Sequence, residues 1–265
     1  MLNLPPLEIV KEAGWLTIWL NRPETRNALS SEMIEALMAA FQDIATDQNI
    51  RGVTLRGKGN TFCAGGDLKG FKSMAAGDQS FEEITAMSRN AGELFMAVSR
   101  LPQIVVVLIE GAAMAGGLGL ACAADIVAST RSAKFSLTET MIGIPPAQIA
   151  PYIVRRVGPT LAKRIMLTGM RMQGDQAMEF GLLDHVCDDA EGLPVFENAI
   201  RQGVMRCAPG ANAATKEILR VTELLPPEKF VEFAAKQFAE ALQGEEGREG
   251  VASFLEKRKP AWALT

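Results

Sequence analysis

The sequence predicts an α/β protein in which a sheet-containing N-terminal part is followed by a helical region. Three observations support this. Short β-rich runs alternate with amphipathic stretches in the first half of the chain. One of them, residues 104–109, is continuously apolar and mostly β-branched, which is typical of a strand buried on both faces. Beyond about residue 145, helix-like stretches separated by Gly and Pro dominate.

The elements of the first half are predicted in chain order. Trp15 to Leu20 is a short strand stopped by Asn21-Arg22-Pro23. A helix is expected from Ser31, capped by Ser30 or Ser31. Strands are predicted at 52–56, 104–109 and 125–129, with a small-residue helix at 117–124, whereas 71–100 is mixed. The helix from Ser31 places these apolar residues on one face: Met33, Ile34, Leu37, Met38, Phe41 and Ile44.

The second half is predicted to be helical. The helix-like stretches are 154–167, 175–180, 194–207, 211–224 and 227–242. The tail after Gly244 carries alternating charges. We therefore divide the chain into a core over 1–195 and a C-terminal helical region over 196–265.

Composition restricts the class of protein. The chain has 265 residues, 48% hydrophobic and 22% charged, which fits one large globular domain. The net charge of −4 argues against nucleic acid as the main partner, and no apolar run is long enough for a membrane span. We find no export or organelle signal, and the four cysteines show no C-x-x-C spacing. A cytoplasmic protein with reduced thiols and no metal site is expected.

Two glycine-containing loops are the most informative feature. The first, residues 60–68, reads NTFCAGGDL, and the second, residues 110–120, reads EGAAMAGGLGL. Each follows a strand-like run, so backbone N–H groups at Ala64 and Gly116 could converge on one carbonyl oxygen and stabilise it as an oxyanion. Taken singly, a tight turn and close helix packing are the simpler interpretations. The second loop does not match the phosphate-binding glycine motifs.

Glu139 is the candidate acid or base. It lies in an otherwise uncharged stretch between Lys134 and Arg155. Desolvation there would raise its pKa toward neutrality, which suits proton transfer. The simpler alternative is a surface glutamate at a helix start.

Together these motifs resemble the crotonases, the enoyl-CoA hydratase/isomerase superfamily. The resemblance runs nearly end to end and also covers LNRP at 20–23, NAL at 27–29, ADI at 124–126, LTG at 167–169 and FLEKR at 254–258. It implies a ClpP/crotonase-like spiral of ββα units whose C-terminal helical region mediates trimers, often paired into hexamers. It also implies CoA thioesters as substrates, with no separate cofactor.

The resemblance assigns roles to individual residues. Ala64 and Gly116 are similar in position to the two oxyanion-hole donors, and Ala64, Gly65, Gly66, Asp67 and Leu68 to the adenine and pantetheine contacts. Arg22 or Arg26 could meet a CoA phosphate. Lys257 or Lys259 could reach CoA, also from a neighbouring subunit.

The chain departs from the family pattern at Gly119. Familiar hydratases have a glutamate there and a second one at the position of Glu139. No Asp or Glu occurs between Ile144 and Arg155 either, so one carboxylate remains. The only histidine, His185, is expected on an edge strand or the surface rather than in catalysis.

Several functions fit one glutamate. Glu139 could activate water for addition to an enoyl thioester, or could move a proton between carbons in a Δ3,Δ2-enoyl-CoA isomerase. The local sequence resembles hydratases of branched glutaconyl-CoA thioesters, either isohexenylglutaconyl-CoA of acyclic terpene breakdown or 3-methylglutaconyl-CoA of leucine breakdown. Flexible methionines favour the longer, terpene-type substrate: Met74, Met87, Met96, Met114 and Met141. A non-catalytic scaffold or RNA-binding protein of this fold is the remote alternative.

Overall fold

A six-stranded sheet forms the centre of the computed structural model, which describes residues 5–222 and 224–263 apart from the side chains of Leu68 and Lys69. Its order is β1-β2-β3-β4-β6-β9, with β1 and β2 antiparallel and the other neighbours parallel. A second sheet has the order β5-β7-β8. The bounds are β1 Leu7–Glu12, β2 Trp15–Leu20, β3 Gly52–Gly57, β4 Ile104–Ile109, β5 Ala112–Met114, β6 Ile126–Thr130, β7 Lys134–Ser136, β8 Met172–Gln173 and β9 His185–Cys187.

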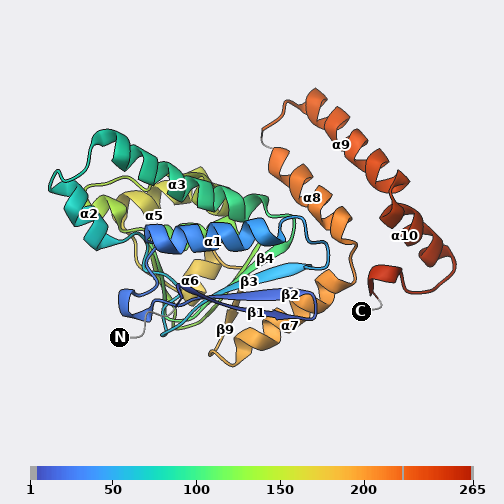
Figure 1. Cartoon of the computed structure of the whole chain (residues 1–265), viewed down its shortest axis with the longest axis horizontal. Coiled ribbons are helices and arrows are strands. Elements are labelled where there is room, and N and C mark those ends of the chain that lie inside the picture. The colour runs from blue at the N-terminus through green and yellow to red at the C-terminus, as the bar shows by residue number, and fades with distance from the viewer. Residues whose placement is uncertain (1–4, 223, 264–265) are drawn as a thin grey trace.

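Strand β4 is buried on both faces, which confirms the prediction from its continuous apolar run. Val105 and Val107 belong to the larger hydrophobic cluster, and Val106 and Leu108 to the smaller one on the other face. Helices α1 (Ser31–Ile44) and α3 (Phe81–Arg100) pack together over one face, and α7 (Gly192–Met205) packs on β4 and β6 from the other (Figure 1).

Helix α1 has the predicted apolar face. Ser30 is its cap, because the Ser30 hydroxyl oxygen accepts the Met33 N–H at 3.3 Å. Of the predicted face, only Met38 is half-buried rather than buried. Each fully buried Leu, Ile or Phe side chain contributes about 1.5–3 kcal/mol, so this face fixes α1 to the sheet.

Two parts of the first half differ from the prediction. The stretch described as mixed forms α2 (Leu68–Ala75) and the 20-residue α3, which begins with a capping box of Ser80 and Glu83. Strand β1 was not predicted, because only Leu7 of its six residues is buried. An exposed edge strand lacks the alternation of apolar and polar residues on which the prediction depends.

The second half is helical, as predicted. The small-residue helix of the first half is α4 (Gly116–Ala123), and the helices of the second half are α5 Ala150–Thr168 (kinked at Gly158), α6 Gly174–Glu179, α7, α8 Pro209–Val221, α9 Pro227–Gln243 and α10 Glu245–Leu255. The charged tail therefore contains α10. The expected division at residues 195 and 196 falls inside α7, whose Leu193 and Phe196 pack on the sheet. Helices α9 and α10 extend away from the sheet (Figure 1).

A half-buried ion pair attaches α8 to the core. Lys216 Nζ lies 2.6 Å from Asp125 Oδ2 and donates to the Gln103 carbonyl at 2.8 Å. The same Asp125 oxygen accepts the Val105 N–H at the start of β4. Burial lowers the pKa of Lys216, and the Asp125 charge opposes that effect. Within the described residues, no helix has the length and apolar character needed to cross a membrane.

Candidate active site

The two glycine-containing loops meet in the structure. The Met114 N–H donates to the Cys63 carbonyl at 2.9 Å, and the two loops form a bridge at Cys63 and Ala113. A Cβ atom at Gly116 would lie 3.8 Å from the Gly66 nitrogen. Gly65 has φ +94°, and a Cβ there would lie 2.7 Å from Ala115 Cβ. Glycine at position 65 therefore lets the loops approach closely, whereas a Cβ at residue 116 would make only ordinary contacts.

Among the described residues, the amides of Gly66 and Gly116 lie at this meeting point without an acceptor. Gly116 is the first residue of α4, so its N–H has no acceptor within the helix and lies at the positive end of the helix dipole. The Gly66 N–H also has no acceptor in the described part of the chain. The Ala64 N–H, in contrast, donates to the Arg26 carbonyl at 3.0 Å. This bond corrects the expectation for Ala64 and makes Gly66 the better donor candidate.

The segment that precedes α1 holds the first loop in place through hydrogen bonds. Asn27 is fully buried, and its side-chain amide donates to the carbonyls of Lys58 at 2.9 Å and Thr61 at 2.7 Å. The Leu29 N–H donates to the Gly65 carbonyl at 2.8 Å. The loop is thus held in place without any contribution from a ligand, as electrostatic stabilisation of a transition state requires.

The second loop stores backbone strain immediately before its donor. Ala115 has φ 50° and ψ −127°, a conformation that costs a residue with a side chain about 1–3 kcal/mol. Its N–H donates to the Ser136 carbonyl at the end of β7, at 2.8 Å. The small sheet therefore holds the conformation that presents the Gly116 amide.

Glu139 follows β7 closely and opens the short 3₁₀ helix η2 (Glu139–Ile142). Its side chain is half-buried, and the Oε2 atom is buried without a hydrogen-bond partner in the described chain. Burial raises the pKa of this carboxyl above its ordinary value of 4.5, although a bond to its own backbone opposes the shift. A partly desolvated carboxyl without a cation beside it suits proton transfer better than a surface role.

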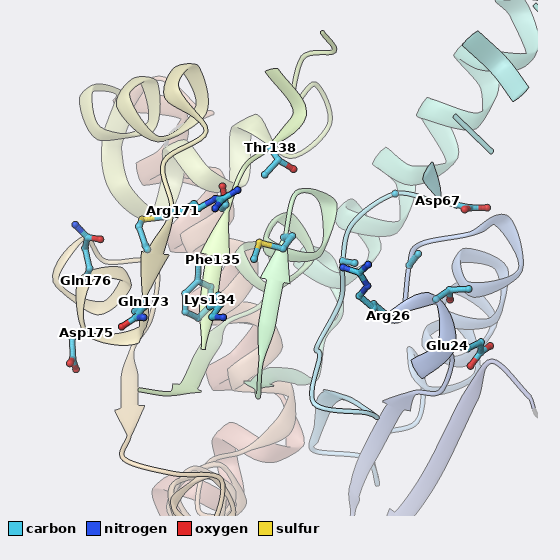
Figure 2. A pocket seen from close by; sticks show the side chains of 17 residues that line it. Glu24, Arg26, Asp67, Lys134, Phe135, Thr138, Arg171, Gln173, Asp175 and Gln176 are labelled. Atoms are coloured by element: carbon cyan, nitrogen blue, oxygen red, sulfur yellow. The ribbon is translucent and has the colours of Figure 1, made fainter. Parts of the chain in front are cut away.

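A groove of about 1010 Å³ borders the first loop at Gly66 and reaches Thr138. Gly116 and Glu139 are not among its lining residues, so each meets it only through a neighbour. Figure 2 shows Glu24, Arg26 and Asp67 on one side and Lys134 and Gln173 on the other. Ala64, Gly66 and Met114 also line it, as does Thr138, the neighbour of Glu139. The groove has the size of a site for a large organic ligand.

Comparison with known proteins identifies the family of the chain. The sequence profile described as "Enoyl-CoA hydratase/isomerase" matches residues 10–264. The chain belongs to this family. Enoyl-CoA hydratase AKT6-1 of Alternaria alternata is 32% identical over 256 residues, or 95% of this chain and 82% of that protein.

Solved structures are similar over nearly the whole chain. AtuE of Pseudomonas aeruginosa has a TM-score of 0.93 and 42% identity, covering 98% of this chain and 100% of that one. An enoyl-CoA hydratase/isomerase from Marinobacter aquaeolei has a TM-score of 0.92 and 37% identity, with the same coverage. The fold is therefore the crotonase fold, and the protein is an enzyme of the enoyl-CoA hydratase/isomerase type.

The basic residues expected at the CoA site of this family divide into two groups. Arg26 lines the groove and makes no ion pair within the described residues. Arg22 does not line it, and its guanidinium donates instead to Glu32 Oε1 at 2.8 Å. Lys257 does not line it either, since it follows α10 at the opposite end of the molecule from α2 (Figure 1). Of the remaining expected contacts, Leu68 opens α2, and its side chain lies outside the described residues.

Two further basic residues line the groove and were not predicted. Lys134 opens β7 and Arg171 precedes β8, and neither makes an ion pair in the described chain. Both are exposed. Their signal in the sequence is weak, because the two- and three-residue strands that bring them together have no recognisable pattern.

Residue 119, where familiar hydratases have their other glutamate, has no room for an acidic side chain. Gly119 is buried inside α4. His185 is the first residue of the edge strand β9, as predicted, and its ring stacks on Phe196 with centroids 4.5 Å apart. Within the described residues, no three His, Cys, Asp or Glu side chains are grouped as metal ligands would be.

Proposed function

We propose that this enzyme adds water across the double bond of isohexenylglutaconyl-CoA, with Glu139 as the single general base. The observation that carries the proposal is the state of that carboxyl, which is half-buried and has one oxygen without a partner among the described residues. It follows the strand whose Ser136 carbonyl accepts the Ala115 N–H next to the second donor. A raised pKa makes this carboxylate a stronger base than an exposed glutamate, which favours taking a proton from water.

The proposed reaction uses three groups of the chain. Glu139 takes a proton from water, and the hydroxide that results forms a bond to Cβ of the enoyl thioester. The electron pair of the double bond moves onto the thioester oxygen, which the Gly66 and Gly116 amides stabilise as an enolate. Glu139 then returns its proton to Cα, which gives the 3-hydroxyacyl thioester and restores the enzyme.

The groove supports a CoA moiety that extends from these amides toward solvent. Arg26, Lys134 and Arg171 surround it without acidic partners among the described residues, so they are suited to phosphates. The stretch from Ala64 to Asp67 borders the same groove and is proposed to contact pantetheine and adenine.

A second cavity, of about 350 Å³, supports a long acyl group. It lies among α1, α2 and α3, and its apolar lining includes Ile34, Met74 and Met87. Glu35 and Glu83 also border it, which favours an apolar tail there over the distal carboxylate. Of the other methionines considered, Met114 lines the CoA groove, whereas Met96 and Met141 are exposed.

Steady-state rates with two substrates test the proposal. Each buried CH₂ contributes about 0.8 kcal/mol, so a tail about five carbons longer should raise kcat/KM by about 100-fold or more over 3-methylglutaconyl-CoA. A preference for the short methyl substrate would reassign the enzyme to 3-methylglutaconyl-CoA. Because one base suffices for a proton shift, turnover of a Δ3-enoyl-CoA is measured in parallel, and its dominance would make the enzyme an isomerase.

We further propose that the chain forms trimers through its last helices. Large apolar side chains on α9 and α10 are exposed, among them Phe238 (68%) and Phe254 (83%). Such side chains mark interaction surfaces when they occur together. In a trimer Lys257 of one subunit is proposed to approach the groove of another. Light scattering after size-exclusion chromatography tests this, and a wild-type monomer at micromolar concentration would refute it.

A further inference from the structure

The segment that leads into α5 inserts two successive side chains against two glycines. A Cβ atom at Gly92 of α3 would overlap the side-chain oxygen of Gln148. A Cβ atom at Gly119 of α4 would overlap Ile149 Cγ2 and lie 2.5 Å from Ile149 Cβ. The two sites differ in kind, because the first meets the end of a flexible side chain and the second meets a branch point.

Ile149 is fixed where it stands. Its side chain is 3% exposed, and its carbonyl accepts the N–H groups of Tyr152 at 3.1 Å and Ile153 at 3.2 Å. A β-branched side chain also has few rotamers available. Ile149 therefore cannot turn aside to admit a side chain at residue 119.

The contact lies on the functional face of α4. Gly119 comes three residues after Gly116, and residues three apart lie on the same face of a helix. Gly116 supplies one of the two proposed oxyanion donors. The apolar side chain of Ile149 thus covers the helix surface next to that donor, where a polar side chain could otherwise approach the reacting atoms.

We propose that Ile149 is a specificity-determining residue. Its apolar side chain occupies the space that an acidic side chain at residue 119 would need, and so excludes a second acid from this site. This inference rests on the proposed function and restricts its substrate class. Efficient substrates are enoyl thioesters that carry a second carboxylate of their own, which holds the attacking water. A short thioester without that group, such as crotonyl-CoA, is a poor substrate of the wild-type enzyme.

Exchange of the pair tests the inference. Three variants are compared with wild type: Gly119→Glu, Ile149→Gly and the double variant. Gly119→Glu alone should lower the melting temperature by about 2–10 °C through overpacking, and the double variant should recover most of that loss. General acid–base catalysis contributes about 10²–10⁴-fold, so the double variant should hydrate crotonyl-CoA at least about tenfold faster than Ile149→Gly.

A matched pair of alanine substitutions isolates the steric part. Gly119→Ala and Gly92→Ala gain the same helix propensity, yet only the first meets an immovable branch point. Gly119→Ala should therefore melt below Gly92→Ala, and adding Ile149→Gly, which removes the Cβ of residue 149 as well, should remove the difference. Equal melting temperatures of the two single variants would overturn the inference.

The outcomes separate this inference from the proposed function. If wild type hydrates the branched glutaconyl substrate but the double variant gains nothing on crotonyl-CoA, the role of Ile149 is overturned and the function stands. If the double variant gains on crotonyl-CoA while wild type does not turn over the branched substrate, the proposed substrate fails and the exclusion of an acid by Ile149 stands.

Discussion

Replacing Glu139 by Gln removes the proton carrier and leaves the side-chain volume nearly unchanged. General acid–base catalysis contributes about 10²–10⁴-fold to a rate. Because this carboxyl both takes a proton from water and returns one to Cα, we expect a loss in the upper half of that range. A loss of about 10³–10⁴-fold in kcat corresponds to about 4–5.5 kcal/mol of barrier.

The same substitution should leave the fold intact. Burial raises the pKa of Glu139, so the folded protein holds this proton more tightly than the unfolded chain does. The contribution of Glu139 to the free energy of unfolding is therefore fully present below pH 4.5, and it is lost as the pH rises through the raised pKa. Glutamine does not titrate, so at pH 7 the variant should melt at or above the wild-type temperature.

The assay follows the ultraviolet absorbance of the conjugated thioester during hydration. Calorimetric titration with CoA serves as the control, because CoA binding should be unchanged in the variant. A variant that keeps more than about a tenth of the wild-type kcat would refute the reasoning, since a general base cannot be removed at so small a cost. A variant that loses CoA binding as well would show that Glu139 supports the groove rather than the reaction.

Four further predictions concern separate parts of the chain. The acid limb of kcat/KM should have its midpoint above 4.5, and a midpoint at or below that value would contradict the raised pKa of Glu139. Arg171→Ala should raise KM for acyl-CoA about fivefold, as loss of an exposed phosphate contact predicts, whereas Arg164→Ala, outside the groove, should not. Gly65→Ala, at φ +94°, should lower both the melting temperature and kcat, and a fully active variant would contradict the convergence of the two loops. Lys216→Met should cost about 1–3 kcal/mol in a denaturant titration because Asp125 stays partly buried, while Lys236→Met, in an exposed pair, should cost less than about 0.5 kcal/mol.

The elements that could be predicted from sequence are those buried in a regular pattern. Strand β4 is apolar throughout because both of its faces are covered, and α1 repeats its apolar residues because one face is covered. Strand β1 and helix α10 escaped prediction for the opposite reason. Both are largely exposed, so their sequences carry little of the periodicity that burial imposes.

The candidate site could be predicted in its residue types but not in its hydrogen bonds. The two loops and Glu139 were identified by their composition and order along the chain. The choice between Ala64 and Gly66 depends on the Arg26 carbonyl, which accepts the Ala64 N–H from a separate segment. Lys134 and Arg171 reach the groove only through the pairing of β7 with β8, which no local pattern indicates.

The packing of Ile149 against Gly119 also restricts how such a chain can change over generations. A codon change that gives residue 119 any side chain is harmful while isoleucine remains at 149, whereas a smaller residue at 149 merely leaves an empty space. Descendants that acquire an acid at 119 are therefore expected to have lost the isoleucine first. Ancestral reconstruction along this lineage can establish the order of the two replacements.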